Sequence, residues 1–245
     1  MTQRSVKHNL EQGHMDQMQN NAIIRGQGRP ATYKTKNGKR VPGVTTILGR
    51  WKESGGLLHW AHGIGYEQGE KGLSPDLYAK RDEAADVGTL IHSLIEADIH
   101  GEPHPSYPAA FESRVISGYS AWRDWLTLNR CEFYATEVPL VSEQYGFGGT
   151  IDVVLRMPNG GLSLCDWKSS AAVYADYLIQ LAAYRQLWEE NGHEPITEGF
   201  NLFRFSKDHG DFEHRRWPEL AEAWELFKHL RAAYDLDRAV KARCK

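Results

Sequence analysis

The sequence predicts a mixed α/β fold, because the spacing of apolar residues changes along the chain. Two stretches with apolar residues at helical spacing, Lys80–Ile99 and Ala109–Leu128, come before three stretches of strand-like composition. A long helical stretch then separates these strands from two more strands and a last helix. This order favours a mixed α/β sandwich over a barrel.

The remaining elements follow from turn signals and helix stops. From Tyr33 to Leu48, an Asn37-Gly38 turn signal lies between short β-prone runs. A helical stretch weakened by glycines, Leu57–Glu70, should precede the two amphipathic helices. The other predicted elements are the strands Glu132–Val141, Gly149–Met157 and Leu162–Lys168, the helix Ala175–Glu190 with a stop at Asn191-Gly192, the strands Gly199–Phe205 and Asp211–Arg216, and the helix Pro218–Val240.

Length and composition are those of a folded protein with one main domain. The 245 residues are 41% hydrophobic and include 8 Trp, 11 Tyr and 8 Phe, which excludes disorder over the whole length. We expect a flexible polar and basic arm over residues 1–28 and a single domain over residues 29–245. Because no stretch is apolar enough for a membrane span or a secretory signal, we expect a cytoplasmic protein.

The three cysteines exclude two kinds of site. Cys131, Cys165 and Cys244 share no metal-ligand spacing. They therefore provide neither a disulfide framework nor a four-thiolate zinc or iron–sulfur site within one chain, so we expect no iron–sulfur cluster.

Charge is distributed unevenly along the chain. Residues 1–52 contain ten Lys and Arg and two acids, which gives 10 − 2 = +8, whereas the remainder has 19 Lys and Arg against 30 acids, which gives −11. This asymmetry suggests a basic arm that meets a polyanion, beside an acidic body that holds cations. The alternative is a solvated basic tail without a specific partner.

Two carboxylates and a lysine form the main chemical constellation. Asp166 and Lys168 lie two apart on a predicted strand, so they share one face of the sheet, while Trp167 points to the opposite layer. A hairpin brings Asp152 from the preceding strand beside them if the register allows. Paired carboxylates repel unless a cation lies between them, and oxygen ligands with at most one imidazole suit Mg²⁺ or Mn²⁺. The alternative is an exposed Asp–Lys pair at a strand end.

The length of the hairpin loop decides whether these side chains meet. A two-residue turn at Asn159-Gly160 would pair Asp152 with Trp167 and put Asp152 on the wrong face. A three-residue loop, over 158–160 or 159–161, sets Asp152 opposite position 166 or 168. We therefore predict an odd-length loop.

Four short motifs follow one another in a recognisable order between Val41 and Asn191. They read GTLIH ending at His92, GTID ending at Asp152, DWKSS at 166–170 and QLAAY at 180–184. In this order the chain resembles the PD-(D/E)XK nuclease superfamily, in particular its RecB-like branch. The segments VPGVTTIL and LLHWA are also similar to the opening of stand-alone exonucleases of phages and of mitochondrial genome maintenance. The resemblance implies a restriction-endonuclease-like core, with a mixed sheet flanked by helices, an N-terminal helical section and a basic arm.

The resemblance also implies roles for individual residues. It makes Lys168 a catalytic residue together with Asp152 and Asp166. Glu137 corresponds more weakly to an acidic residue that some members place before the aspartate, and from its position alone it is a cross-strand partner. Glu96 shares a helical face with His92, an implied metal ligand. The implied metal ligands are His92, Asp152, Asp166 and the carbonyl of Trp167.

Several residues are candidates for binding the substrate. Gln180 and Tyr184 share a helical face and are placed to present an amide and a phenol to a sugar-phosphate, although the same helix also has the pattern of one packed on the sheet. Ser169 either bonds a phosphate or caps the following turn. Lys39 and Arg40, with the neighbouring basic residues, are placed to hold phosphates without sequence choice.

These observations predict a DNA exonuclease that depends on one or two Mg²⁺ or Mn²⁺ ions. We expect it to act on single-stranded DNA or DNA with free ends, in bacterial or phage replication, recombination or repair. The sequence has no phosphate loop of a helicase motor, so unwinding requires a partner such as a helicase, and a recombinase or a single-strand-binding protein is a further candidate partner. The alternatives are an endonuclease, flap or CRISPR-adaptation nuclease of the same superfamily, or a DNA-end-binding module without turnover.

Overall fold

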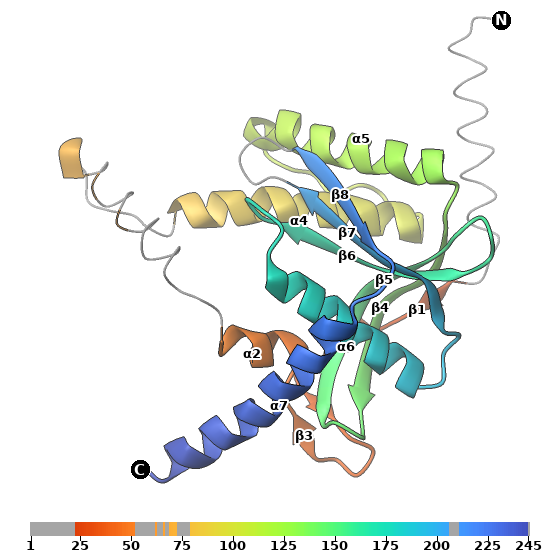
Figure 1. Ribbon diagram of the computed structural model, residues 1–245. Helices are drawn as coiled ribbons and strands as arrows, with labels where there is room; N and C mark the ends of the chain where they lie inside the picture. Colours follow the sequence, from red (N-terminus) through yellow and green to blue (C-terminus); the bar gives the residue numbers. More distant parts are fainter. Residues whose placement is uncertain are drawn as a thin grey trace, which may run out of the picture.

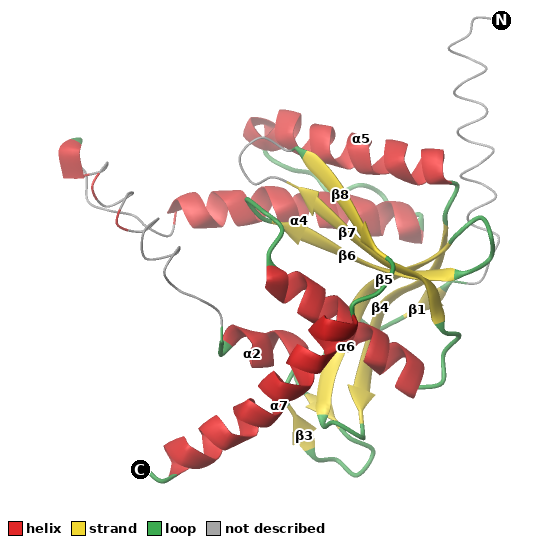
Figure 2. Cartoon of the chain, in the orientation of Figure 1, coloured by secondary structure: helices red, strands yellow, loops and turns green. Residues whose placement is uncertain are grey.

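A computed structural model describes residues 23–51, 62, 66, 69–72, 79–205 and 211–244, and it confirms the mixed α/β fold. In this part of the chain, a six-stranded sheet has the order β1-β4-β5-β6-β7-β8 (Figures 1 and 2). β1 pairs with β4 and β6 with β7 in parallel, whereas the other neighbours are antiparallel. The strands are β1 (Ile24–Arg25), β4 (Glu132–Ser142), β5 (Phe147–Arg156), β6 (Leu162–Ser169), β7 (Ile196–Phe205) and β8 (Phe212–Trp217).

Helices cover both faces of this sheet. Figure 1 shows α4 (Ala79–His100) and α5 (Glu112–Asn129) on one face, and α6 (Ala175–Glu190) and α7 (Ala221–Ala242) on the other. A short 3₁₀ turn, Ala109–Phe111, leads into α5. Each layer has its own apolar core, centred on Trp122 and Trp167 under α4 and α5, and on Phe147 and Trp188 under α6 and α7. The sheet is therefore buried on both sides, which suits a site built on its central strands.

The β5–β6 loop has the odd length that the sequence predicts. Arg156 pairs with Leu162, and the amide of Met157 donates to the carbonyl of Gly161, so the loop is Pro158–Gly160. Gly160 has a φ of 88°, a left-handed conformation that glycine adopts without a steric cost.

The N-terminal region contains a separate small hairpin, as the Asn37-Gly38 signal predicts. β2 (Tyr33–Lys34) pairs antiparallel with β3 (Arg40–Val41). The β-prone pattern is wrong beyond this hairpin, because Val44–Gly49 forms the helix α2. The physical reason is tertiary burial: α2 buries Val44, Ile47 and Leu48 against the α6 core, and this outweighs their local β propensity.

The structure describes only part of the N-terminal region. Residues 24–28, which the sequence places in the N-terminal arm, lie along β4, and Ile24 pairs with Ala135. Most of the predicted helix Leu57–Glu70 and most of the N-terminal arm lie outside the described residues, whereas residues 62, 66, 69 and 70 are described as helical. No helix in the described ranges has the length and apolar character to cross a membrane.

A partly buried polar network ties α5 to the far edge of the sheet. Trp125 donates from Nε1 to Nδ1 of His214 at 3.1 Å, so the His214 proton is on Nε2, which donates to Oδ1 of Asn201 at 2.7 Å. Asn201 donates in turn to Ser163 Oγ at 2.6 Å. Burial, reinforced by Arg216, lowers the pKa of His214 below its usual value. The network therefore requires a neutral imidazole.

This network predicts a loss of stability in mild acid. As the pH falls through the usual histidine pKa, the unfolded state binds a proton that folded His214 resists, so the free energy of unfolding decreases, by at most about 1.4 kcal/mol per pH unit for each proton. We expect urea unfolding from about pH 7.5 to about pH 5.5 to show a shallower decrease for His214→Gln than for the wild type. His229→Gln, at an exposed position of α7, should retain the wild-type slope; equal slopes in all three proteins would contradict the prediction.

Candidate active site

The three side chains that the sequence analysis singles out converge on the central strands. β5 and β6 pair Val153 with Cys165, and the next step of this register sets Asp152 opposite Asp166. Lys168 Nζ lies 2.5 Å from Asp166 Oδ2. Asp166 is 1% exposed, so this charge cluster is inside the protein.

Electrostatics in this cluster are dominated by burial and by like charge. Burial, and then Asp166, raise the pKa of Asp152 well above its usual value. Burial by itself lowers the pKa of Lys168, but Asp166 and Asp152 outweigh that effect and raise it. Lys168 is therefore an ammonium ion at neutral pH, able to hold an anion or a water oxygen but not to act as a base.

Gln180 and Tyr184 lie directly behind Asp166. Gln180 donates from Nε2 to Asp166 Oδ1 and to the Tyr184 hydroxyl, each at 3.0 Å. Both residues are buried, with 6% and 5% exposure. Burial and the nearby carboxylates raise the pKa of Tyr184, so it remains a phenol. The described contacts orient Asp166, and a contact of Gln180 or Tyr184 with substrate stays a prediction.

Glu137 joins the acidic cluster in an unusual backbone conformation. It lies between the register pairs Thr136–Val153 and Val138–Ile151, which places it across from Asp152. Its φ is 51°, a left-handed value that is strained in a strand. Burial, then Glu96 and Asp166, raise the pKa of Glu137 to about 7. Burial also raises the pKa of Glu96 on α4. A cation or a proton shared between Glu96 and Glu137 would therefore stabilise both side chains.

His92 and Ser169 lie at the interface between α4 and the sheet. His92 contacts the rings of Trp167 and Phe205, with centroids 6.1 and 6.3 Å away. Burial and Lys168 lower the pKa of His92 to about 4, so the imidazole is neutral, the form that binds metals. Ser169 packs against Gly88, where a Cβ would lie 1.6 Å from the serine Oγ. A phosphate contact of Ser169 stays a prediction.

The donor atoms fit a hard divalent cation in composition. His92 Nε2 is buried without a hydrogen-bond partner in the described part of the chain, and Asp166 Oδ2 has Lys168 Nζ as its ion-pair partner. Carboxylate oxygens with one imidazole suit Mg²⁺ or Mn²⁺. Within the described ranges, no three His, Cys, Asp or Glu side chains are already grouped at metal-binding distances. Binding through Asp152, Asp166, His92 and the Trp167 carbonyl therefore stays a prediction that requires small side-chain movements.

The predicted phosphate-binding residues lie apart from the acids. Lys39 and Arg40 are exposed on the β2–β3 hairpin. This hairpin reaches the site through Tyr33, whose hydroxyl lies 2.9 Å from Thr150 Oγ1, two residues before Asp152. Two aromatic side chains of the N-terminal part of the chain, Trp51 and Tyr66, are also exposed, by 45% and 64%.

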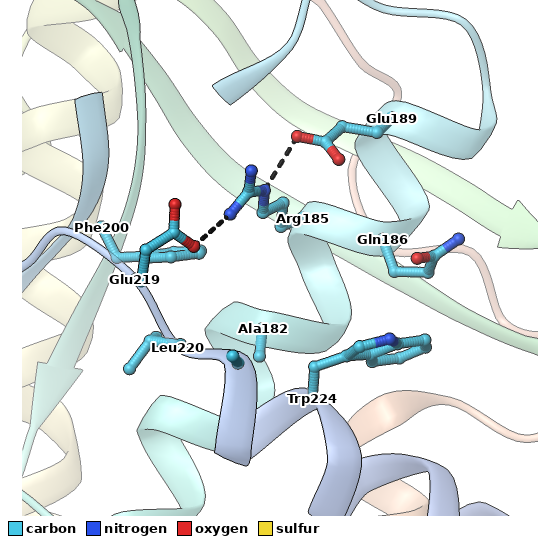
Figure 3. Close-up of a pocket in the computed structure, with 9 residues that line it drawn as sticks. Ala182, Arg185, Gln186, Glu189, Phe200, Glu219, Leu220 and Trp224 are labelled. Atoms are coloured by element: carbon cyan, nitrogen blue, oxygen red, sulfur yellow. Dashed lines mark hydrogen bonds and ion pairs between the residues drawn. The ribbon is translucent and has the colours of Figure 1, made fainter. Parts of the chain in front are cut away.

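A pocket of about 240 Å³ lies on the other side of α6, away from the acidic cluster. Figure 3 shows Arg185 between Glu189 and Glu219, and each ion pair measures 2.8 Å. Trp224 and Phe200 form apolar walls of the pocket. Because its charged groups already pair with one another, we assign it the role of joining α6 to the start of α7.

A sequence profile described as the PD-(D/E)XK nuclease superfamily matches residues 61–242. The chain belongs to this superfamily. It is therefore a nuclease with the restriction-endonuclease-like fold that the motifs predict, and nucleases of this superfamily generally use divalent metal ions. No curated protein is similar enough in sequence to count as a match.

Three solved structures are similar to this nuclease at low sequence identity. An exonuclease candidate from Eubacterium rectale is 16% identical with a TM-score of 0.44, covering 62% of this chain and 68% of that one. SSO0001 is 17% identical with a TM-score of 0.29 and the same coverage of 62% and 68%. LHK-Exo in complex with dAMP is 15% identical with a TM-score of 0.33, covering 66% and 90%.

Sequence reasoning missed the segment that supports Glu137. The Gly26 amide donates to the carbonyl of Thr136 at 2.8 Å, and that of Gly28 to the carbonyl of Glu137 at 3.3 Å. A Cβ on Gly26 would lie 1.7 Å from the Glu137 carbonyl oxygen. The one available signal was the two glycines of the GQG segment 26–28, one residue after the β-branched pair Ile23-Ile24, and this pattern is too common to interpret alone.

The close approach of Gly26 to β4 makes alanine unfavourable there. We expect Gly26→Ala to lower the free energy of unfolding by about 1–3 kcal/mol, because a backbone oxygen must move, and to lower cleavage through displacement of Glu137. Urea unfolding and a cleavage assay measure the two effects. Gly49→Ala is the matched control, since nothing lies within 4 Å of its added Cβ; equal stability of the two variants would refute the close packing.

Proposed function

We propose that this nuclease is a metal-dependent DNA exonuclease of the RecB-like branch, which hydrolyses phosphodiester bonds at DNA ends and favours single strands. The observation that carries the proposal is the buried cluster of Asp152, Asp166 and Lys168 on adjacent strands. Two acids and one lysine leave an excess of negative charge, which a divalent cation would offset. A bound Mg²⁺ or Mn²⁺ would supply a Lewis acid for the phosphate and lower the pKa of an attacking water.

The protein groups have separate tasks in this reaction. Asp152 and Asp166 hold the cation, and Gln180 fixes the orientation of Asp166 through Oδ1. Lys168, as an ammonium ion, positions the attacking water or offsets charge that develops on the phosphate. Tyr184 keeps its proton and supports the Gln180 amide. The Trp167 carbonyl and His92 complete the proposed ligand set.

DNA as the substrate is supported by the basic N-terminal region. Residues 1–52 have a net charge of +8, and Lys39 and Arg40 are exposed in the described part of it. Such groups bind phosphates without reading bases, which suits trimming of ends in replication, recombination or repair. A helicase, a recombinase or a single-strand-binding protein would supply the unpaired ends.

One assay separates this proposal from its alternatives. Linear DNA labelled at either end and circular DNA labelled within the strand, each in single-stranded and duplex forms, are incubated with Mg²⁺, Mn²⁺ or EDTA. Release of mononucleotides or short products from linear strands with the circle intact supports an exonuclease. Cleavage of the circle indicates an endonuclease, and tight binding of ends without cleavage under any metal indicates a non-catalytic module.

The acidic cluster predicts which substitutions abolish turnover. We expect Asp166→Asn and Lys168→Ala to lower cleavage by roughly a hundred- to a thousand-fold or more, because each removes a charge that acts on the transition state. DNA binding measured in EDTA should change little. Lys228→Ala, which removes an ammonium paired with Glu225 on α7, should cleave like the wild type. Normal turnover of either site variant in a folded protein would remove the assignment.

The hairpin predicts a salt effect on binding. We expect the double variant Lys39→Ala/Arg40→Ala to bind single-stranded DNA more weakly, and the slope of log K against log salt to fall in magnitude by about 0.7 for each phosphate that the variant no longer binds. Fluorescence anisotropy at several salt concentrations measures this slope. Lys241→Ala/Arg243→Ala removes the same charge from the end of α7 and should leave the slope unchanged. Equal slopes for both double variants would place the phosphate contacts elsewhere.

A further inference from the structure

Two tyrosines at the start of α6 form an aromatic pair beside the acidic cluster. The Tyr174 and Tyr177 rings meet edge to face, with centroids 5.6 Å apart at 82°. Tyr174 is 46% exposed, whereas Tyr177 is half-buried. We propose that Tyr174, supported by Tyr177, is a stacking platform for an unpaired nucleobase adjacent to the scissile phosphate. This inference rests on the proposed function and identifies the part of the substrate that the site holds.

The tyrosines lie on the solvent side of the charge cluster. Lys168 Nζ lies 5.4 Å from the centre of the Tyr177 ring. The Lys168 side chain is 19% exposed, whereas that of Asp166 is 1% exposed. Exposure therefore increases from the buried carboxylate through the lysine to the Tyr174 ring. A phosphate held at Lys168 would have its own or the adjoining base within reach of this ring.

The platform is held in place before any substrate arrives. Arg204 donates from Nη1 to the Ser170 carbonyl at 3.0 Å, and Ser170 Oγ donates to the Ala172 carbonyl at 2.8 Å. The Tyr177 amide donates to the Tyr174 carbonyl at 3.1 Å. The backbone between β6 and α6 is thus fixed by hydrogen bonds, while the Tyr174 ring remains at the surface. Such preorganisation lowers the entropy cost of binding a base.

The chemistry of the pair selects a class of substrate. Aromatic rings stack on every nucleobase, so this contact tolerates any sequence. A base in the interior of a duplex has both faces covered by its neighbours and cannot use the platform without unstacking. The Tyr174 ring therefore favours a nucleotide that is already unpaired, as at a single-stranded end. The ring would account for a preference for single-stranded DNA. The basic hairpin does not account for this preference, because its charges bind the phosphates of single-stranded and duplex DNA alike.

Equilibrium binding in EDTA tests the platform without turnover. The probe is a single-stranded oligonucleotide with 2-aminopurine near one end, whose fluorescence falls on stacking. We expect quenching with the wild type and with Tyr174→Phe, which keeps the ring, and loss of most quenching with Tyr174→Ala, together with binding weakened about five-fold or more. Tyr234→Ala removes a half-buried tyrosine ring from α7 and should leave quenching intact. Unchanged quenching in Tyr174→Ala, or loss of quenching in Tyr234→Ala, would overturn the proposal.

A cleavage experiment separates this inference from the proposed function. An oligonucleotide with abasic sites around the scissile position should have a higher KM than the normal strand for the wild type and for Tyr174→Phe. For Tyr174→Ala the two substrates should have the same KM. If the protein cleaves no DNA but Tyr174 still quenches the probe, the proposed exonuclease activity fails and the platform stands. If cleavage is normal and Tyr174→Ala still discriminates against abasic sites, the platform fails and the exonuclease stands.

Discussion

The burial of two carboxylates at neighbouring positions of β5 and β6 is the constraint on which the site depends. Asp152 and Asp166 repel each other strongly because little water screens them, and Lys168 offsets one charge of the two. The remaining charge has to be met by a proton or by a cation. A phosphodiester is itself an anion and cannot approach uncompensated carboxylates. On the proposed function, a bound cation would offset this repulsion and let the substrate approach.

The surrounding structure keeps this unfavourable arrangement in one geometry. Helices on both faces exclude water from the central strands, and Gln180 fixes one oxygen of Asp166. Glu137 adds a third carboxylate at the cost of a left-handed backbone, which the glycine segment along β4 stabilises through two amides. Strained residues that persist in a strand are typical of functional sites, because stability alone would favour their replacement. The strain at Glu137 therefore supports its inclusion in the site.

The sequence was sufficient for features that depend on local periodicity and on loop length. The pleat placed Asp166 and Lys168 on one face, and the requirement that Asp152 join them predicted the three-residue loop that is observed at 158–160. It was insufficient where tertiary contacts decide. Burial turns the β-prone segment after Pro42 into α2, and a close approach by a distant glycine sets the backbone of Glu137. These contacts join residues far apart in the chain, so no local pattern indicates them.

The residues proposed for catalysis and those proposed for substrate selection lie on different elements of the fold. The groups proposed to act on the phosphate lie on paired central strands, where displacement by an ångström would change the reaction. The groups proposed to select the substrate lie on the β2–β3 hairpin and at the β6–α6 connection, outside the sheet's hydrogen bonds. On these proposals, substitutions at Lys39, Arg40 or Tyr174 would alter which DNA is bound without disturbing the carboxylates. Substrate preference and chemistry are then separable in this nuclease, because they depend on different parts of one fold.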